Sequence, residues 1–309
     1  MASTRKKPAV GQEAAPRHEG VVVSAHGRQY RIEQADGSLL SCFPRGKKSE
    51  LVCGDRVAYQ ITAADQGVIE TLLPRRNLLY RSNEFRQKLI AANVDLVVLV
   101  AATEPRFSDE LLTRCLLAAE SQDIATLIVL NKCDLADRLS VARERLHAFT
   151  VLGTPVLELS AHHDAAPLLP WLAGKTSVMV GQSGMGKSTL INALIPEAQA
   201  ATREISAALD SGKHTTTHAT RYALHGTGCR ETYLIDSPGL QEFGLGHLGR
   251  DALEHGFTDF RPYLGQCRFR NCRHDQEPGC ALQAAIADGK IAPRRLALFH
   301  TLAAAIVTP

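Results

Sequence analysis

The sequence predicts a multi-domain protein with a small β-barrel, a central α/β domain and a short, mainly helical C-terminal domain. Three patterns support this prediction: short alternating runs up to residue 79, a strand–helix–strand rhythm from residue 93, and a Cys/His cluster near the C-terminus. A chain of 309 residues fits about two or three domains. We expect a disordered tail at 1–19 and domains at 20–79, 80–243 and 244–309.

The composition is that of a globular protein, with 45% hydrophobic and 22% charged residues. No apolar run approaches the roughly 18 residues of a spanning helix, and the basic start lacks the apolar stretch of a signal peptide. We therefore expect a cytoplasmic protein with no membrane partner. Residues 1–88 hold 15 Lys/Arg against 9 Asp/Glu, which favours an anionic partner there or simply a solvated basic surface.

Five short segments in the first domain are predicted strands, because apolar and polar residues alternate in them. Turn residues separate them, as in Ala35-Asp36-Gly37 and Cys53-Gly54-Asp55. Five strands in about 60 residues fit a small barrel of the OB type. The predicted strands are Val21–Val23, Gln29–Ile32, Leu39–Phe43, Arg56–Tyr59 and Gly67–Glu70.

The central domain begins with Val94–Ala101, a continuous apolar run of the kind that a buried parallel strand requires. A helix is expected over Ser108–Glu120, with Ser108 as its N-cap. Each of four later strands ends in a polar motif, at the edge where open α/β sheets bind ligands. These strands are Ala125–Leu130, Pro155–Leu159, Ser177–Val180 and Thr232–Ile235.

The third of these strands leads into a match to the phosphate-loop pattern G-x-x-x-x-G-K-[ST]. Glycines allow backbone N–H groups to face phosphates at a helix N-terminus, whereas a plain glycine-rich turn is the alternative. Lys187 is expected to contact the β- and γ-phosphates and act in catalysis, and the Ser188 hydroxyl to bind Mg²⁺. The predicted loop comprises Gly181, Gln182, Ser183, Gly184, Met185, Gly186, Lys187, Ser188 and Thr189.

Two further motifs predict that the base is guanine. Asn131-Lys132-Cys133-Asp134 follows one strand, and Ser160-Ala161 follows the next. The Asp134 carboxylate can accept hydrogen bonds from guanine N1–H and N2–H, and Ser160 and Ala161 can offer backbone N–H groups to O6. A site built around such pairing rejects adenine, which lacks these donors, by roughly 10⁴-fold. A simple loop cap, or an ATPase or kinase with the same phosphate loop, remains the alternative.

Asp236-Ser237-Pro238-Gly239 follows the last strand. We expect Asp236 to hold Mg²⁺ and the Gly239 N–H to sense the γ-phosphate. Thr215 or Thr216, between this motif and the phosphate loop, is the candidate for completing the Mg²⁺ coordination.

Leu240 stands where many GTPases place a glutamine that orients the attacking water. An aliphatic side chain cannot hydrogen-bond water, so hydrolysis needs another group or is slow. His214 is our candidate for that catalytic role, with His218 as the alternative.

The C-terminal cluster is Cys267-x₄-Cys272-x-His274-x₅-Cys280, followed by helix from about Cys280 to Ala305. Three sulfurs and one imidazole are the ligand set of a closed structural Zn²⁺ site. A disulfide with a free thiol, or four unrelated residues, is the alternative. Arg268, Arg270 and Arg273 lie between the ligands, either as phosphate contacts or as a solvated basic face.

The order of the motifs is the most specific feature. The guanine-reading motif precedes the phosphate loop, whereas ordinary GTPases carry the phosphate loop first. The sequence therefore predicts a circularly permuted GTPase domain.

Four features of the sequence resemble the ribosome-small-subunit-dependent GTPase A family. They are this order of motifs, Gly212-x-His214-Thr215-Thr216-Thr217, Asp236–Leu240 before Glu242-Phe243-Gly244, and the Cys/His cluster. The resemblance spans about residues 20 to 300. It implies an OB-fold, a permuted GTPase domain and a zinc-binding domain. It also implies hydrolysis of GTP to GDP and phosphate in late maturation of the small ribosomal subunit, stimulation by that subunit, and rRNA binding, and we expect a monomer. Ser237 and Asp210-Ser211 depart from the family pattern, and a nucleotide-regulated RNA-binding module with incidental hydrolysis is the alternative.

Overall fold

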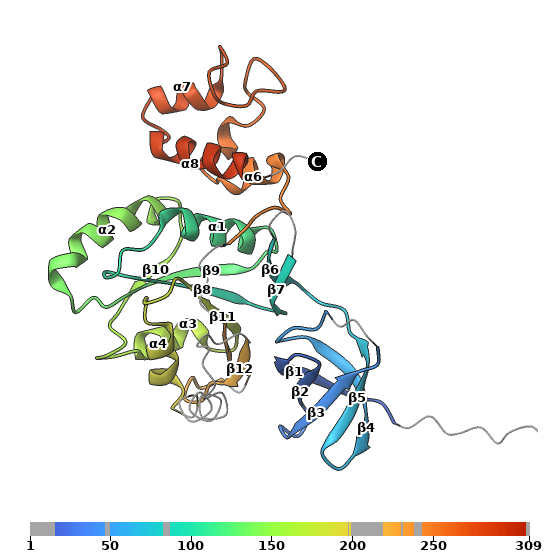
Figure 1. Cartoon of the computed structure of the whole chain (residues 1–309). Coiled ribbons are helices and arrows are strands. Elements are labelled where there is room, and N and C mark those ends of the chain that lie inside the picture. Colours follow the sequence, from blue (N-terminus) through green and yellow to red (C-terminus); the bar gives the residue numbers. More distant parts are fainter. Residues whose placement is uncertain are drawn as a thin grey trace, which may run out of the picture.

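The computed structural model describes residues 16–46, 50–82, 87–196, 198, 219–229, 231–237 and 243–306. Three units follow one another along the chain: a barrel, an α/β domain with helices on both faces of its sheet, and a small helical module (Figure 1). Within the described residues, no helix is both long enough and apolar enough to cross a membrane.

The barrel is a closed five-stranded sheet in the order β1-β2-β3-β5-β4, completed by pairing of β1 with β4. Neighbouring strands are antiparallel except for β3 and β5, which are parallel. Alternate side chains such as Val22, Ile32 and Tyr59 fill its interior. All five predicted strands are confirmed, with bounds His18–His26, Gln29–Glu33, Leu39–Pro44, Arg56–Ala63 and Gln66–Leu72 for β1 to β5.

A two-stranded hairpin, β6 (Leu78–Ser82) and β7 (Gln87–Ala92), follows the barrel. The sequence did not predict it, because neither glycine nor proline marks a turn between the two strands. The hairpin leads directly into the first strand of the α/β domain.

The α/β domain has five parallel strands and one antiparallel strand in the order β10-β9-β8-β11-β13-β12. Every residue of β8 is buried, as expected of its continuous apolar sequence. The expected strands are confirmed, and β12 is an addition. The bounds are Leu96–Ala102 (β8), Ala125–Asn131 (β9), Val156–Glu158 (β10), Thr176–Val180 (β11), Thr220–Ala223 (β12) and Tyr233–Asp236 (β13).

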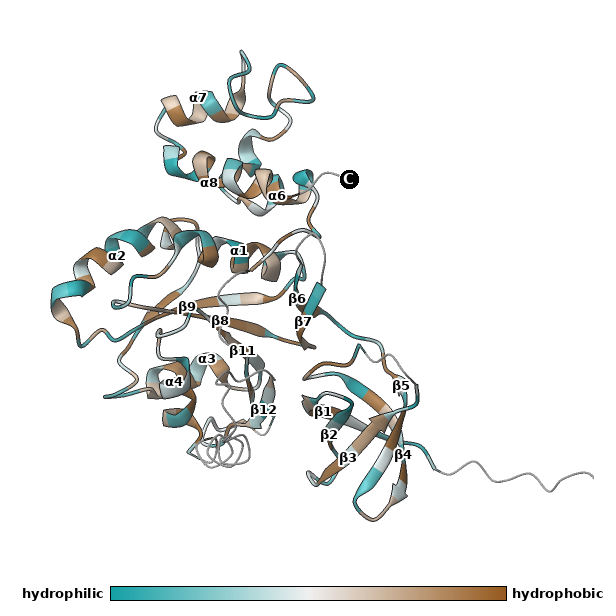
Figure 2. Cartoon of the chain, in the orientation of Figure 1, coloured by the Kyte–Doolittle hydropathy of each residue, from teal (hydrophilic) through white to brown (hydrophobic). Residues whose placement is uncertain are grey.

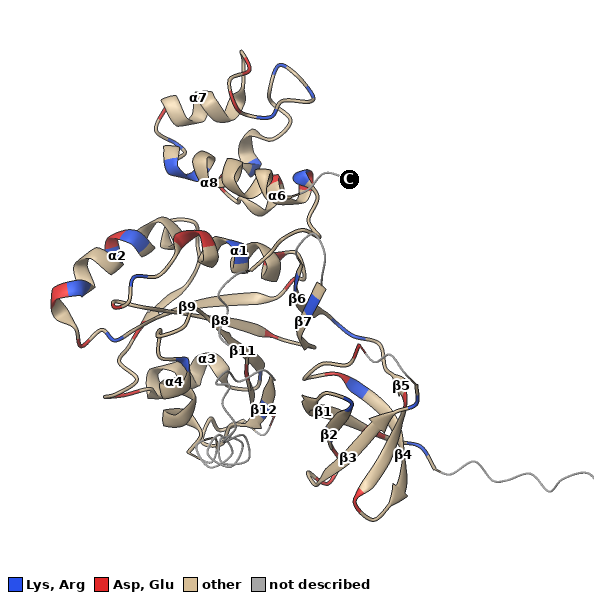
Figure 3. Ribbon diagram, in the orientation of Figure 1, with Lys and Arg blue, Asp and Glu red and all other residues tan. Residues whose placement is uncertain are grey.

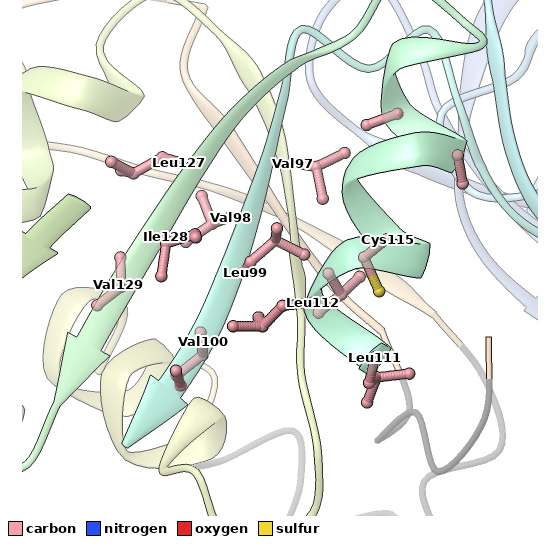
Figure 4. Packing of buried hydrophobic residues seen from close by; sticks show 14 of the residues in the cluster. Val97, Val98, Leu99, Val100, Leu111, Leu112, Cys115, Leu127, Ile128 and Val129 are labelled. Atoms are coloured by element: carbon pink, nitrogen blue, oxygen red, sulfur yellow. The ribbon is translucent and has the colours of Figure 1, made fainter. Parts of the chain in front are cut away.

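Helices cover both faces of this sheet. α1 (Asp109–Glu120) and α2 (Ala136–Thr150) lie on one face, and α3 (Leu169–Leu172) and α4 (Lys187–Leu194) lie on the other (Figure 1). The short η1 (Ala166–Leu168) precedes α3. Ser108 caps α1 as predicted, because its side chain accepts a hydrogen bond from Leu111 N. Leu112 of α1 packs towards Leu99 of β8 (Figure 4). Figure 2 shows the same apolar interior along the strands.

The barrel and the α/β domain share one continuous sheet, because β12 pairs with β1 at Thr220 and Ser24. Arg221 of β12 is ion-paired with Glu33 of the barrel and lies 3.3 Å from the centre of the Tyr233 ring. The turn at Gly54 has a φ of 91° and leaves no room for a side chain, since a Cβ would lie 2.2 Å from Ala92 O. The barrel is therefore joined closely to the edge of the sheet of the α/β domain.

The C-terminal module contains α6 (Arg250–Gly256), η2 (Arg261–Tyr263), α7 (Ala281–Ala287) and α8 (Pro293–Ala304). The helical segment expected from about Cys280 to Ala305 is divided in two, since Gly289 has a φ of 71° and Pro293 starts α8. Phe257, Phe260 and Phe299 are fully buried and form the centre of the module.

The module rests on α1. A Cβ at Gly256 would lie 2.3 Å from Leu117 Cδ2, and Arg261 donates to Glu120 at 2.6 Å. These contacts place the module on the α1 side of the sheet (Figure 1).

Candidate nucleotide site and metal cluster

The phosphate-loop sequence folds as a tight glycine-rich turn between β11 and α4. Gly186 has a φ of 91°, and a Cβ there would lie 2.3 Å from Asn131 Nδ2. A Cβ at Gly181 would lie 2.4 Å from Val100 O. Both positions therefore require glycine for space, and the helix N-terminus beyond them directs its free N–H groups into the loop.

Lys187 lies across the loop and is only 9% exposed. Its Nζ donates to Gly181 O at 2.6 Å and to Gln182 O at 2.8 Å. Burial lowers the pKa of Lys187, and the nearby Asp236 carboxylate acts in the opposite direction. Gln182 fixes the loop from outside, because its Oε1 accepts a hydrogen bond from Ser108 N at 2.8 Å.

Asn131, the first residue of the Asn-Lys-x-Asp motif, links the phosphate loop to the Ser160-Ala161 segment. Its Nδ2 donates to Met185 O at 2.9 Å, and its Oδ1 accepts from Ala161 N at 2.9 Å. The side chain is 2% exposed, so both hydrogen bonds are shielded from water. Lys132 adds a third link by donating to Gly184 O at 2.8 Å. The three predicted segments are thus brought together by side chains of the Asn-Lys-x-Asp motif itself.

Asp134 lies at the exposed end of this arrangement. The neighbouring Ser160 hydroxyl lowers the pKa of its carboxyl, although no hydrogen bond of standard geometry joins the two groups. The carboxylate is therefore ionised at neutral pH and available as an acceptor. Cys133 fills the variable position and donates from its backbone N to Leu159 O at 3.2 Å, which aligns the two strand ends.

Asp236 ends β13 directly beside Met179 of β11. Burial raises the pKa of its carboxyl to about 6, and the Lys187 ammonium opposes this increase. Ser237 is buried and donates from Oγ to Met179 O at 2.9 Å. A partly desolvated carboxylate of this kind gains from a bound cation, so the donor chemistry of Asp236 and the exposed Ser188 fits Mg²⁺.

The remaining predicted positions of this site lie outside the described residues. They are the catalytic candidate His214, its alternative His218, the Mg²⁺ candidates Thr215 and Thr216, the phosphate sensor Gly239 and the substituted position Leu240.

The predicted metal ligands form one compact cluster. One ligand atom from each of Cys267, Cys272, His274 and Cys280 lies within 4.8 Å of all the others. His274 Nδ1 is 3.6 Å from Cys267 Sγ and 3.4 Å from Cys280 Sγ. Three thiols and one ring nitrogen converging in this way fit a tetrahedral structural Zn²⁺ site.

Glu254 supports this cluster and was not predicted. Its Oε1 lies 3.6 Å from His274 Nε2, and Arg250 Nε donates to the same oxygen at 3.1 Å. A carboxylate on one ring nitrogen leaves the other to bind metal, and here it selects Nδ1. Glu254 lies on α6, well before the Cys/His pattern, and only its i,i+4 spacing from Arg250 is visible in the sequence.

The fold and these sites define a class: a GTP-binding α/β domain with its motifs in permuted order, carrying an OB-type barrel and a Cys₃His module. The family model described as RsgA GTPase matches residues 72–246. The chain therefore belongs to the RsgA GTPase family and is a GTP hydrolase.

Named relatives and solved structures agree. The chain is 55% identical over 306 residues to the "Small ribosomal subunit biogenesis GTPase RsgA" of Burkholderia pseudomallei strain K96243, covering 97% of this chain and 96% of the relative. It is 53% identical over 304 residues to the protein of the same name from Ralstonia pickettii strain 12J, with the same coverage.

YjeQ from Thermotoga maritima superposes with a TM-score of 0.71 at 30% identity, over 94% of this chain and 98% of that one. YloQ, described as a circularly permuted GTPase, gives a TM-score of 0.67 at 26% identity, over 96% and 98%. The predicted permutation and family are thereby confirmed.

Proposed function

We propose that this protein hydrolyses GTP during late maturation of the small ribosomal subunit, that the subunit stimulates the hydrolysis, and that the protein contacts rRNA. The observation that carries this proposal is the 55% identity, over 97% of the chain, to a relative named for biogenesis of that subunit. The protein would act in the cytoplasm and as a monomer.

In the proposed site, the N–H groups of Gly181–Thr189 bind the phosphates and Lys187 moves from its loop carbonyls onto the β- and γ-phosphates. Ser188 and Asp236 hold Mg²⁺, which neutralises phosphate charge when bound. Thr215 or Thr216 completes that coordination, Gly239 senses the γ-phosphate, and His214 directs the attacking water.

The Asn-Lys-x-Asp motif and the Ser160-Ala161 segment select the base. Asp134 accepts from guanine N1–H and N2–H, and Ser160 presents its backbone N–H to O6. The Ala161 N–H, which was also expected to contact O6, instead donates to Asn131 Oδ1 at 2.9 Å. Asn131, Lys132 and Cys133 hold these groups in register with the phosphate loop, which supports recognition of guanine over adenine.

We propose that the C-terminal cluster holds one structural Zn²⁺ through Cys267, Cys272, His274 and Cys280. Four protein ligands leave no open position for water, so this metal would contribute to folding of the module and not to hydrolysis. Removing it with a chelator should unfold the module and leave the phosphate loop able to bind nucleotide.

The decisive experiment measures GTP turnover with and without purified small subunits, together with subunit affinity in GDP and in a non-hydrolysable GTP analogue. We expect the subunit to raise turnover and the analogue to strengthen subunit binding. The variant Lys187→Ala should remove turnover, and large subunits serve as a matched control. Equal turnover with and without small subunits would instead favour a nucleotide-regulated RNA-binding module, the reading that Leu240 supports because it cannot orient water.

A further inference from the structure

We propose that the loop of residues 268–271 binds an unpaired nucleotide of RNA, with Phe269 stacking on the base and Arg268 and Arg270 contacting the flanking phosphates. This inference deepens the proposed function and rests on it, since it names the form of RNA that the metal-bearing module would recognise.

Phe269 is the exception among the aromatic rings of its module. It is 43% exposed, whereas Phe257, Phe260 and Phe299 are all fully buried. Burying another phenyl ring normally stabilises a small module, so a ring left in water is available for another partner. The guanidinium of Arg268 lies 5.5 Å from the centre of the Phe269 ring.

The arginines of the module fall into two groups. Arg250, Arg261 and Arg295 each pair with a carboxylate. The exposed side chains of Arg268, Arg270, Arg273 and Arg294 have no carboxylate partner within the described part of the chain, and of these Arg268 and Arg270 flank Phe269. Figure 3 shows basic positions in the loop beside α7, at the top of the molecule.

The loop is held at both ends, so its exposed ring is presented at low entropic cost. It runs between two ligand cysteines, and Arg268 N donates to Gly279 O at 3.0 Å. Cys272 N closes the turn by donating to Phe269 O at 3.3 Å. A fixed aromatic face flanked by unpaired guanidinium groups is the arrangement used for single-stranded nucleic acid, whose bases are free to stack.

The test uses the full-length, metal-loaded protein and a single-stranded RNA of about 12 nucleotides, a usual site size, with 2-aminopurine at one position. The same strand annealed to its complement is the second probe. We expect wild type to prefer the single strand and to quench the fluorescence by stacking. Phe269→Leu, which keeps an apolar side chain but removes the aromatic face, should bind the single strand about tenfold more weakly and lose the quenching. Phe269→Trp should retain both.

Arg270→Gln should weaken binding of either RNA and reduce its salt dependence, whereas Arg138→Gln, at a 68% exposed site on α2, should change neither. Metal content, measured for every variant, shows that the module is intact. Unchanged binding in both Phe269→Leu and Arg270→Gln would overturn the inference and leave a protein as the partner of this loop. Failure of small subunits to stimulate wild-type turnover, with these RNA results intact, would refute the proposed function and not the stacking site.

Discussion

Asn131→Ala should lower the free energy of unfolding of the nucleotide-free protein. The substitution removes two buried hydrogen bonds, to Met185 O and from Ala161 N, and leaves both backbone groups without a partner. Each unsatisfied buried group costs about 1–3 kcal/mol. Since Asn131 is 2% exposed, water cannot easily replace the amide. A total loss of about 3 kcal/mol in the free energy of unfolding is therefore the expectation, at the lower end of that range.

Thermal unfolding of the nucleotide-free protein, followed by circular dichroism, measures this loss. For a domain of this size, about 3 kcal/mol corresponds to a decrease in Tm of roughly 6–12 °C. Titration with fluorescent GDP should show that affinity falls at least tenfold as well, because the phosphate loop and the Ser160-Ala161 segment lose their common support. Asn131→Asp is the comparison variant: it keeps the acceptor for Ala161 N, loses the donor to Met185 O and places a carboxylate at a 2% exposed site, so it should lower the Tm at least as much as Asn131→Ala.

The two measurements distinguish whether the Asn131 amide contacts the nucleotide directly or supports the segments around it. If Asn131→Ala weakens GDP binding while the Tm of the nucleotide-free protein stays at the wild-type value, the amide acts on the nucleotide directly and the bracing argument is refuted. A decrease in both quantities supports bracing.

Three further perturbations follow from the two sites. Burial raises the pKa of Asp236 from 3.8 to about 6, so its stabilising contribution is present below pH 4 and is lost as the pH rises through 6, to a total of about 3 kcal/mol. Asp236→Asn should therefore raise the free energy of unfolding at about pH 7.5, leave it unchanged at about pH 4 and abolish Mg²⁺-dependent hydrolysis; equal effects at both pH values in chemical denaturation would contradict this. Glu254→Ala should weaken zinc retention by about 10–100-fold in a chelator competition, because His274 loses the group that fixes its ring, and wild-type retention would show that the ring is held without it. Asp134→Asn should shift the base preference from guanine towards xanthine in nucleotide competition, and an unshifted preference would support an ATPase or kinase.

Local patterns predicted the parts of this molecule whose causes are local. The alternating runs predicted all five barrel strands, and Ser108 was recognised as a cap. The apolar run of Val94–Ala101 predicted a buried strand, which the structure places at Leu96–Ala102. The nucleotide motifs were recognised because each needs particular residue types at fixed spacing. Their convergence followed from one topological rule, that parallel strands deliver their ends to one edge.

Contacts between distant segments could not be read in the same way. Arg221 and Glu33 are 188 residues apart, and no sequence pattern at either position indicates that they form an ion pair. Glu254 supports the metal cluster from a helix that precedes it, and only the fold brings the two together. The bracing role of Asn131 was also missed, since its motif suggested base contact while the structure directs its amide to Met185 O and Ala161 N.

The described chain on either side of the proposed phosphate-sensing segments leads to an accessory unit. β12 is the strand that enters the sheet after residues 199–218, and it is also the strand that pairs with the barrel at Ser24. On the other side of β13, the described chain resumes at residue 243 and runs beside the hairpin, where Ser82 N donates to Gly244 O and Gly246 N donates to Ser82 O, both at 3.0 Å. It then enters the module that rests on α1.

In an ordinary motif order, the chain leaving Asp-x-x-Gly continues within its own sheet. Here the described residues on either side of the proposed γ-phosphate sensor lead to different accessory units, β12 to the barrel and residues 243–248 to the metal-bearing module. We propose that a change at the phosphate sensor reaches these units through the flanking strands without crossing the core of the nucleotide domain. We propose that GTP hydrolysis alters the relative placement of the barrel and the metal-bearing module, because the barrel side is held by a partly buried ion pair and the module side by backbone pairing with β6.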